Sequence, residues 1–279
     1  METVKLANGV ELPKLGMGVL QIRDASEFQT AFNSAIDQGF RLFDTAQSYG
    51  NEDLLGQAIK TNGIPRDQIM ITSKLKIPNC TYENAKASFY DSLKKLQTDY
   101  LDLLLIHHPY YDIYGAWRAM EELYKAGHIR AIGISNFQPD RLEDFLFHTD
   151  IHPMLHQFQI NPYFQQNKLV RLTQKNGVVA EAYSPFAQGK FNIFTDFRLV
   201  KIAEAHGKTT GQVMLRWLTQ RDIIAIPKSS SPARLKENSD IFDFTLTDEE
   251  MDEIFDMDMN CSSLPQEFEP YWIDHMSRF

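Results

Sequence analysis

Four side chains in the first half of the chain could together protonate an oxygen atom, and they belong to Asp44, Tyr49, Lys74 and His107. The pKa of a tyrosine phenol is about 10 in water, and a neighbouring ammonium group lowers it. Asp44 could supply the opposite charge that a buried lysine needs, and the His107 imidazole could orient a substrate oxygen or help to pass its proton. This set suits carbonyl reduction. Reduction also needs a hydride, which no side chain provides, so the sequence implies a cofactor.

Each of these residues also has an ordinary structural interpretation. Asp44 precedes a helix that begins near Glu52, so it could be a helix cap or a surface charge. Lys74 could be solvated, and His107 could be a hydrogen-bonded core histidine. The chemical interpretation is favoured because polar residues repeatedly occur at the same place, directly after short apolar segments, where strands should end.

The rest of the chain alternates short apolar segments with amphipathic ones. We expect strands near residues 15–18, 41–43, 69–73, 101–106, 129–134, 155–159, 178–182 and 223–226. We expect helices from near residue 52 and over residues 26–38, 82–96, 112–125, 165–175, 196–206, 209–220, 232–238 and 247–258. The alternation predicts parallel βαβ units, and eight such strands in 279 residues predict a (β/α)8 TIM barrel as a single domain, residues 1–279. An open doubly wound sheet is the alternative, but no Gly-x-Gly-x-x-Gly follows the first strand, which has only Gly16 and Gly18.

Additional elements are expected at both ends of the barrel sequence. Two alternating segments around Asn8-Gly9 predict an N-terminal β-hairpin that caps the barrel. Ser26 with Gln29, and Thr247 with Glu250, have the spacing of helix capping boxes. The segments after the last strand predict extra C-terminal helices.

Polar residues at the ends of the other predicted strands extend the candidate site. In a parallel barrel the C-terminal strand ends meet at one mouth, where such enzymes hold their active sites. The residues at these ends are Ser135, Asn136, Gln157, Tyr183, Ser184, Lys228 and Ser229.

The segment after the eighth strand predicts an anion site. Ser231 is expected at the N-cap and Pro232 at the first helical position, so free backbone N–H groups and the helix dipole would face an anion. Lys228 and Arg234 add two positive charges. In barrels, phosphate groups commonly bind near the last strands.

Composition excludes several other classes of function. The net charge is −9 with no basic block, which argues against nucleic-acid binding. No apolar run is long enough to span a membrane, and the N-terminus has no signal-peptide core. Cys80 and Cys261 match no metal-ligand spacing and are expected to be free thiols in the cytoplasm.

Taken together, these residues resemble the aldo-keto reductase family. The matching segments follow the order of the family and cover almost the full chain: "GVELPKLGMG", "FDTAQSYGNE", "TSKL", "LDLLLIHHP", "AIGISNF", "AYSPF" and "IPKSSSPARLKEN". The compact length and the segment "WRAMEELYKAGHIRAIGISNF" are most similar to short bacterial members, including diketogluconate reductase-like proteins. The resemblance implies an NADPH-dependent oxidoreductase without a metal, usually a monomer, in which the pro-R hydride of NADPH reduces an aldehyde or ketone to an alcohol.

The resemblance also implies roles for individual residues. Tyr49 would be the general acid, with its pKa lowered by Lys74; Asp44 would pair with Lys74, and His107 would orient the carbonyl. Ser135, Asn136 and Gln157 would hold the nicotinamide carboxamide, Tyr183 would stack on the ring, and Ser184, Pro185 and Phe186 would lie in the loop that crosses the pyrophosphate. Lys228, Ser229 and Arg234 would bind the ribose phosphate, which favours NADPH over NADH, with Glu237 and Asn238 near the adenine. The implied cofactor site is completed by Gly18, Val19, Leu20, Asp44 and Ser230.

The implied substrate pocket departs from the family. His108 stands where many relatives have tryptophan, and Leu20 and Lys76 replace frequent aromatic residues. We expect these three residues, with Tyr49 and His107, to line a pocket more polar than usual, and Trp272 to replace lost aromatic surface. The alternative functions are an NADPH-binding sensor or regulatory protein with little turnover, and another barrel enzyme such as an isomerase or aldolase.

Overall fold

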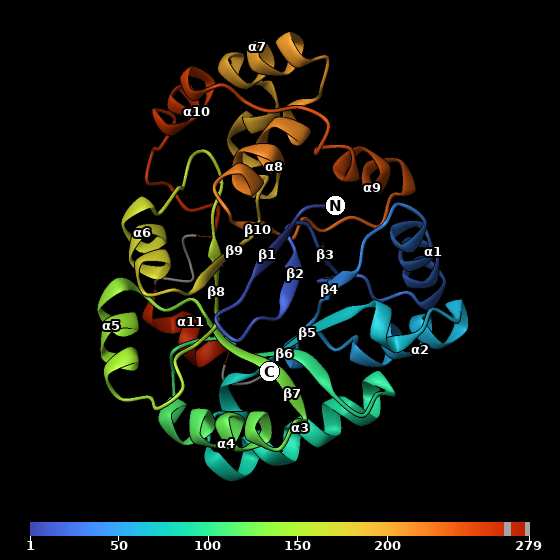
Figure 1. Cartoon of the computed structure of the whole chain (residues 1–279), viewed down its shortest axis with the longest axis vertical. Helices are drawn as coiled ribbons and strands as arrows, with labels where there is room; N and C mark the ends of the chain where they lie inside the picture. The colour runs from blue at the N-terminus through green and yellow to red at the C-terminus, as the bar shows by residue number, and fades with distance from the viewer. Residues whose placement is uncertain (265–268, 277–279) are drawn as a thin grey trace.

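The computed structural model describes residues 1–264 and 269–276 and shows eight parallel strands that close into a barrel (Figure 1). The strands are β3 (Met17–Gly18), β4 (Leu42–Asp44), β5 (Met70–Leu75), β6 (Leu101–Ile106), β7 (Ile129–Ser135), β8 (Leu155–Gln159), β9 (Val179–Tyr183) and β10 (Ile224–Ala225). The first and last strands join through parallel bridges from Leu15 to Ala225 and from Gly18 to Lys228. The predicted closed barrel is therefore confirmed, and the open sheet is excluded.

Helices surround the strands and bury their apolar faces against them (Figure 1). They are α1 (Ala25–Asp37), α2 (Glu52–Asn62), α3 (Tyr82–Leu96), α4 (Ile113–Lys125), α5 (Pro139–Phe147), α6 (Asn167–Lys175), α7 (Phe197–His206), α8 (Thr210–Gln220), α9 (Pro232–Ser239), α10 (Asp248–Phe255) and α11 (Pro270–Met276). The large side chains Phe89, Trp117 and Trp217 are fully buried in this layer. The helices thus hold the strands rigidly, which is what a site built from strand ends needs.

The predicted N-terminal hairpin is present and lies over the barrel (Figure 1). It pairs β1 (Thr3–Lys5) with β2 (Glu11–Pro13), and its turn contains Gly9 at a φ of 89°, a left-handed conformation that favours glycine. Asn8 Nδ2 donates a hydrogen bond of 2.8 Å to the Arg130 carbonyl at the start of β7. The hairpin therefore closes the N-terminal end of the barrel and leaves the C-terminal end as the mouth.

Three local predictions differ from the structure. The capping box of Ser26 and Gln29 is wrong, because Asp24 is the N-cap of α1 and accepts a hydrogen bond from the Glu27 backbone N–H at 2.8 Å. Helix α5 was not predicted, because nine residues after β7 show too little periodicity, although Pro139 stands at its first position. Helix α10 ends at Phe255, three residues before the predicted end at residue 258. The capping box of Thr247 and Glu250 at its start is confirmed.

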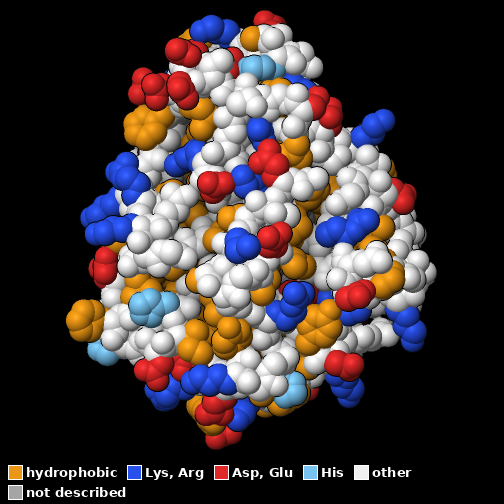
Figure 2. Space-filling model, in the orientation of Figure 1, with side chains coloured by type: hydrophobic (Ala, Val, Ile, Leu, Met, Phe, Trp, Pro, Cys, Tyr) orange, Lys and Arg blue, Asp and Glu red, His pale blue; other side chains and the backbone are white. Residues whose placement is uncertain are grey.

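Charged side chains of both signs are interspersed over the face seen in Figure 2, without a large patch of one sign. No helix in residues 1–264 and 269–276 is long and apolar enough to cross a membrane. Within the same residues, no cluster of His, Cys, Asp and Glu side chains could hold a metal ion.

Candidate active site

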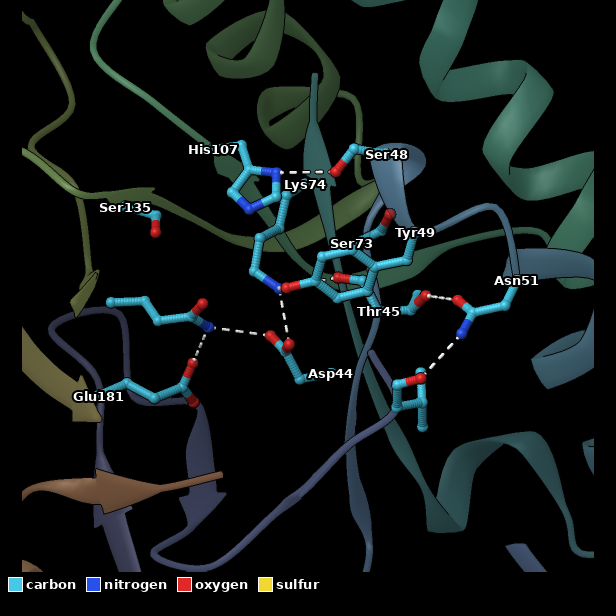
Figure 3. A network of polar contacts seen from close by, with 12 residues as sticks. Asp44, Thr45, Ser48, Tyr49, Asn51, Ser73, Lys74, His107, Ser135 and Glu181 are labelled. Carbon is cyan, nitrogen blue, oxygen red and sulfur yellow. Dashed lines mark hydrogen bonds and ion pairs between the residues drawn. The ribbon is translucent and has the colours of Figure 1, made fainter. Parts of the chain in front are cut away.

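The Lys74 ammonium group is the centre of the candidate site, at the mouth of the barrel (Figure 3). Its Nζ lies 2.6 Å from Asp44 Oδ1, 2.9 Å from the Thr45 carbonyl oxygen and 3.2 Å from the Tyr49 hydroxyl. Lys74 comes from β5, Asp44 ends β4, and Tyr49 ends the 3-10 helix Gln47–Tyr49. Because an ammonium group has three N–H donors, these contacts satisfy a side chain that has no access to water. Three of the four predicted catalytic residues therefore meet at one nitrogen.

The charge of Lys74 is maintained by its partners. Burial acts to lower the pKa of Lys74, but the charges and hydrogen bonds of Asp44 and Tyr49 outweigh burial, so that its pKa lies above the usual value. The side chain is therefore an ammonium cation at neutral pH, beside the Tyr49 oxygen. A cation at this distance stabilises negative charge on that oxygen.

His107, the fourth predicted residue, lies just after β6 and faces Tyr49. The two rings meet edge to face with centroids 5.7 Å apart, and His107 Nδ1 lies 3.3 Å from Ser48 Oγ (Figure 3). Burial, with the charges of His108 and Lys74, lowers the pKa of His107 well below 6.5, so the imidazole is neutral. A Ser48 hydroxyl that donates to Nδ1 leaves the ring proton on Nε2, which is then available to a substrate oxygen.

Neighbouring residues of the same motif hold the loops around the site, a role that the sequence analysis missed. Asn51 Nδ2 donates to the Val19 carbonyl at 2.8 Å, while Asn51 Oδ1 accepts from Thr45 Oγ1 at 2.8 Å (Figure 3). Glu52 Oε1 accepts from Ser73 Oγ at 2.7 Å. The segment from Asp44 to Glu52 thus joins β3, β4 and β5. The only sequence signal for this role was that the matching motif continues past Tyr49 to Glu52.

The residues expected to hold a nicotinamide carboxamide gather on the opposite side of the mouth. Asn136 Nδ2 donates to the His107 carbonyl at 3.0 Å and to Ser135 Oγ at 3.2 Å, and Asn136 Oδ1 accepts from the Tyr183 hydroxyl at 2.8 Å. Asn136 has a φ of 65°, a left-handed conformation that asparagine tolerates. Gln157 Nε2 donates to Asp44 Oδ2 at 2.9 Å, so the two halves of the site are joined.

Glu181 is a site residue that the sequence analysis missed. It lies in β9, is 1% exposed, and accepts a hydrogen bond of 2.5 Å from Gln157 Nε2 (Figure 3). Burial, with the charge of Asp44, raises its pKa to about 8. An acidic residue inside the apolar segment "VVAEAY" was the available signal, because a buried carboxyl group needs a specific partner.

The segment after β10 has the features of a phosphate site. Helix α9 begins at Pro232, and its N-cap Ser231 makes no side-chain capping bond, which leaves first-turn N–H groups available to an anion. Lys228 and Arg234 are exposed beside it, and Ser229 Oγ accepts from the Ser231 backbone N–H at 3.1 Å. Gly18 faces this segment so closely that a Cβ would lie 3.2 Å from the Ile226 carbonyl oxygen. The donor set, the charge and this close approach fit a dinucleotide phosphate.

The remaining residues predicted for the cofactor follow β3, β9 or β10, or lie in α9. Ser184 has a φ of 48° directly after β9, and Phe186 packs on Phe194 with ring centroids 5.5 Å apart. Glu237 Oε1 already accepts a hydrogen bond of 2.6 Å from Thr209 Oγ1. The others are Val19, Pro185 and Asn238, which are buried, and Ser230, which is half-buried.

The predicted substrate residues divide between the mouth and its surroundings. Leu20 is 41% exposed after β3, whereas His108 is buried and stacks on His107 with centroids 4.6 Å apart. Burial, with the charge of Lys74, lowers the pKa of His108 to about 4. Lys76 borders a polar cavity of about 380 Å³ between Gln47 and α3. Trp272 is half-buried in α11. The polar pocket that these residues were expected to form remains a prediction.

Comparison with known proteins places this site in a family. Residues 14–258 match the model of the aldo/keto reductase family. The chain is 45% identical over 254 residues to a glyoxal reductase of Bacillus subtilis, covering 91% of each chain. It is 38% identical over 258 residues to a methylglyoxal reductase of Escherichia coli O157:H7, covering 91% of this chain and 93% of that one. A crystal structure of a Bombyx mori aldo-keto reductase in complex with NADP is similar, with a TM-score of 0.89, 30% identity and coverage of 96% and 97% of the two chains.

Proposed function

The chain belongs to the aldo/keto reductase family and is an NADPH-dependent oxidoreductase, and we propose that Tyr49 supplies the proton in its reduction of carbonyl groups to alcohols. The observation that carries this proposal is the set of three contacts made by the buried Lys74 ammonium, one of which is to the Tyr49 hydroxyl. A regulatory protein with little turnover would have no use for a fully buried cation held against a phenol. An isomerase or aldolase would not need NADPH, so failure to bind NADPH would favour that alternative.

In this mechanism the residues of the chain position and move one proton. NADPH, when bound, supplies the hydride that no side chain can provide. Tyr49 donates its phenolic proton to the substrate oxygen as negative charge develops there, and Lys74 stabilises the phenolate that remains. Asp44 keeps the ammonium group in place. His107, which is neutral, donates from Nε2 to the same oxygen and so orients the carbonyl.

The residues at the mouth would hold the cofactor in two places. Ser135, Asn136 and Gln157 would bind the nicotinamide carboxamide, because they offer hydroxyl and amide groups within one hydrogen-bonded set. Lys228 and Arg234 would bind the 2′-phosphate beside α9. Replacing Arg234 with alanine should weaken the affinity for NADPH about tenfold to hundredfold and leave NADH almost unchanged, as measured by fluorescence titration. Equal weakening of both would remove Arg234 from the 2′-phosphate site.

For the substrate we propose small polar aldehydes of the kind named for the two bacterial relatives, glyoxal and methylglyoxal. The replacement of bulky aromatic residues by Leu20, Lys76 and His108 supports a pocket without a strongly apolar wall. We also propose that the protein acts as a monomer and forms a single domain, which is supported for the domain by the match of residues 14–258 to one family model. It would bind no nucleic acid, in line with its acidic charge. It would work in the cytoplasm, where NADPH is supplied and Cys80 and Cys261 stay reduced.

NADPH oxidation measured against glyoxal, methylglyoxal, keto acids, sugars and aromatic aldehydes tests the proposal. The Tyr49→Phe variant is the matched control, because it removes one oxygen atom and keeps the ring. We expect it to lower kcat by at least about 10³-fold while the affinity for NADPH changes less than about threefold. Absence of turnover by the unaltered protein on every carbonyl compound would refute the enzyme assignment. Loss of NADPH binding in the variant would refute the proton-donor role of Tyr49.

A further inference from the structure

Glu181 is a buried carboxyl group that the proton transfer proposed above does not use. It lies within the barrel rather than in the helical layer, because its partner Gln157 also contacts Asp44 at the mouth (Figure 3). A carboxyl group that is 1% exposed is costly to bury, so its retention at this position calls for an explanation.

The hydrogen bonds of Gln157 fix the orientation of its amide group. An amide nitrogen has two N–H donors, and Gln157 Nε2 uses them toward Asp44 Oδ2 at 2.9 Å and Glu181 Oε1 at 2.5 Å. A flipped amide would place its oxygen against two carboxyl groups. The Gln157 carbonyl oxygen therefore stays free as an acceptor, and within residues 1–264 and 269–276 it receives no hydrogen bond. An acceptor in this position suits the NH2 group of a carboxamide.

The charges around Glu181 do not balance unless it holds a proton. The groups that face it are Gln157 from β8, Asp44 from β4 and Lys74 from β5, while its partner in the register of β10 is the apolar Ile224. One ammonium cation is therefore shared between two carboxyl groups. With a proton on Glu181 the cluster is neutral, and without it the cluster carries one uncompensated negative charge. The raised pKa, about 8, agrees with this balance.

Glu181 is also close to the expected position of the nicotinamide ring. Tyr183, the residue expected to stack on that ring, is two positions further along β9, so both side chains are on the same face of the strand, roughly 7 Å apart along it. The ring is neutral in NADPH and cationic in NADP+. A carboxylate beneath it would favour the cationic form, and a protonated carboxyl group would not.

We propose that Glu181 is a positioning residue that fixes the Gln157 amide and exchanges a proton with solvent as the bound cofactor changes between its reduced and oxidised forms. When NADP+ binds to the enzyme with a protonated Glu181, Glu181 becomes a carboxylate in the complex and one proton is released to solvent. NADPH binds without this release. The proposal rests on the proposed placement of the nicotinamide at Gln157 and Tyr183, and it adds a linkage between pH and cofactor preference.

Binding measurements can test this linkage without turnover. The dissociation constants of NADP+ and NADPH would be measured by tryptophan fluorescence from about pH 6 to about pH 9, and their ratio taken, because the 2′-phosphate titrates in both and cancels. Below the pKa of Glu181, binding of NADP+ must expel a proton. We therefore expect the ratio of the NADP+ to the NADPH constant to fall by about tenfold per pH unit as pH rises toward about 8 and then to level off.

Two variants separate the charge of Glu181 from its hydrogen bond. Glu181→Gln can still accept a hydrogen bond from Gln157 but cannot ionise, so we expect near-normal affinity and a ratio independent of pH. Glu181→Leu removes the acceptor, and we expect it to weaken both cofactor forms about tenfold. Calorimetry of NADP+ binding in buffers of different ionisation enthalpy counts the released proton directly in the unaltered protein. The number of protons released on NADP+ binding tests the proposal even if neither variant folds.

The outcomes distinguish this proposal from the proposed function. A pH-independent ratio in the unaltered protein, or the same pH dependence in Glu181→Gln, would overturn the role of Glu181 while leaving the reductase assignment intact. Failure of the unaltered protein to bind either cofactor form would overturn the cofactor site itself.

Discussion

The two ends of the barrel each bury a carboxylate beside cationic side chains, but the two arrangements differ. Toward the N-terminal end, Asp102 of β6 accepts from Arg66 Nη2 at 2.7 Å, Arg130 Nη1 at 2.9 Å and the Ile71 backbone N–H at 3.0 Å. Both guanidinium groups reach solvent, with 20% and 42% of their side-chain surface exposed. At the mouth, Asp44 and Glu181 share the single cation of Lys74, which has no exposed surface.

This difference predicts that the Asp102 cluster stabilises the fold and that the Lys74 cluster performs chemistry. Around Asp102 the cations outnumber the carboxylate and remain hydrated, so the charges are satisfied and have little effect on other groups. At the mouth, water does not screen Lys74, so its charge acts strongly on the Tyr49 oxygen. A buried ion pair is weak evidence for stability by itself. Its surroundings decide which role it has.

The largest expected effect is on activity, from replacing Lys74 with methionine. The variant removes the cation that lies 3.2 Å from the Tyr49 hydroxyl, and we expect kcat to fall about 10³-fold with NADPH affinity changed less than about threefold. Steady-state kinetics measure kcat, and fluorescence titration measures the affinity for NADPH. Because Asp44 is left buried without its ion-pair partner, the double variant Lys74→Met/Asp44→Asn is the control. It should recover the stability lost in the single variant but not the activity, and recovery of activity would contradict the role of Lys74.

The next effect should appear only in stability. Replacing Asp102 with asparagine leaves Arg66, Arg130 and the Ile71 N–H without a charged acceptor, and we expect the free energy of unfolding to fall by about 3 kcal/mol. Denaturant unfolding measures this loss, and kcat at a temperature where the variant is folded should be unchanged within about twofold. A large fall in kcat would mean that the two ends of the barrel are coupled through β5 and β6 and that the Asp102 cluster also affects activity.

The sequence predicted that Asp44, Tyr49 and Lys74 lie close together, as the structure shows, because the signals are local. Asp44 ends β4, Lys74 is one residue before the end of β5, and His107 directly follows β6. Parallel strands in a barrel bring their C-terminal ends together. Glu181 was missed because it lies inside a strand, two residues before its end. Its importance depends on Gln157 from another strand, which is a tertiary contact that no spacing reveals. The N-cap Asp24 was missed because several polar residues compete as caps and the fold selects one. Helix α5 was missed because its nine residues show too little periodicity.

A third buried polar group, His156, belongs to neither end of the barrel and affects the pH dependence of stability. It lies in β8 with Nδ1 3.1 Å from Thr173 Oγ1, and burial lowers its pKa to about 3. The unfolded chain, with a histidine pKa near 6.5, binds a proton below that pH that the folded chain does not bind. Stability is therefore fully present above about pH 6.5 and is lost as pH falls, by roughly 1.4 kcal/mol per pH unit for this residue.

The His156→Gln variant tests this contribution. Urea unfolding at about pH 7 and about pH 5.5 should show a smaller loss of stability in the variant than in the unaltered protein, by roughly 1 kcal/mol, with unchanged kcat at neutral pH. His107 and His108 also have lowered pKa values and will leave a residual loss in both proteins. An identical loss in both proteins would show that the pKa of His156 is not lowered in the folded chain.

The smallest expected effect separates the chemistry of the mouth from its specificity. His108 stacks on His107 at 4.6 Å and near-parallel to Tyr110 at 6.2 Å, and an indole at this position would add apolar surface. We expect His108→Trp to raise kcat/KM for an aromatic aldehyde relative to glyoxal about fivefold, with NADPH affinity within about twofold. Phe147→Trp, at a position that is 90% exposed on α5, is the control for a tryptophan that cannot contact substrate. If the relative rates across the aldehydes do not change, His108 supports the His107 ring rather than contacting the substrate. The polarity of the pocket would then have to come from Lys76, and the buried stack would join the Lys74 cluster as part of the proton-transfer machinery.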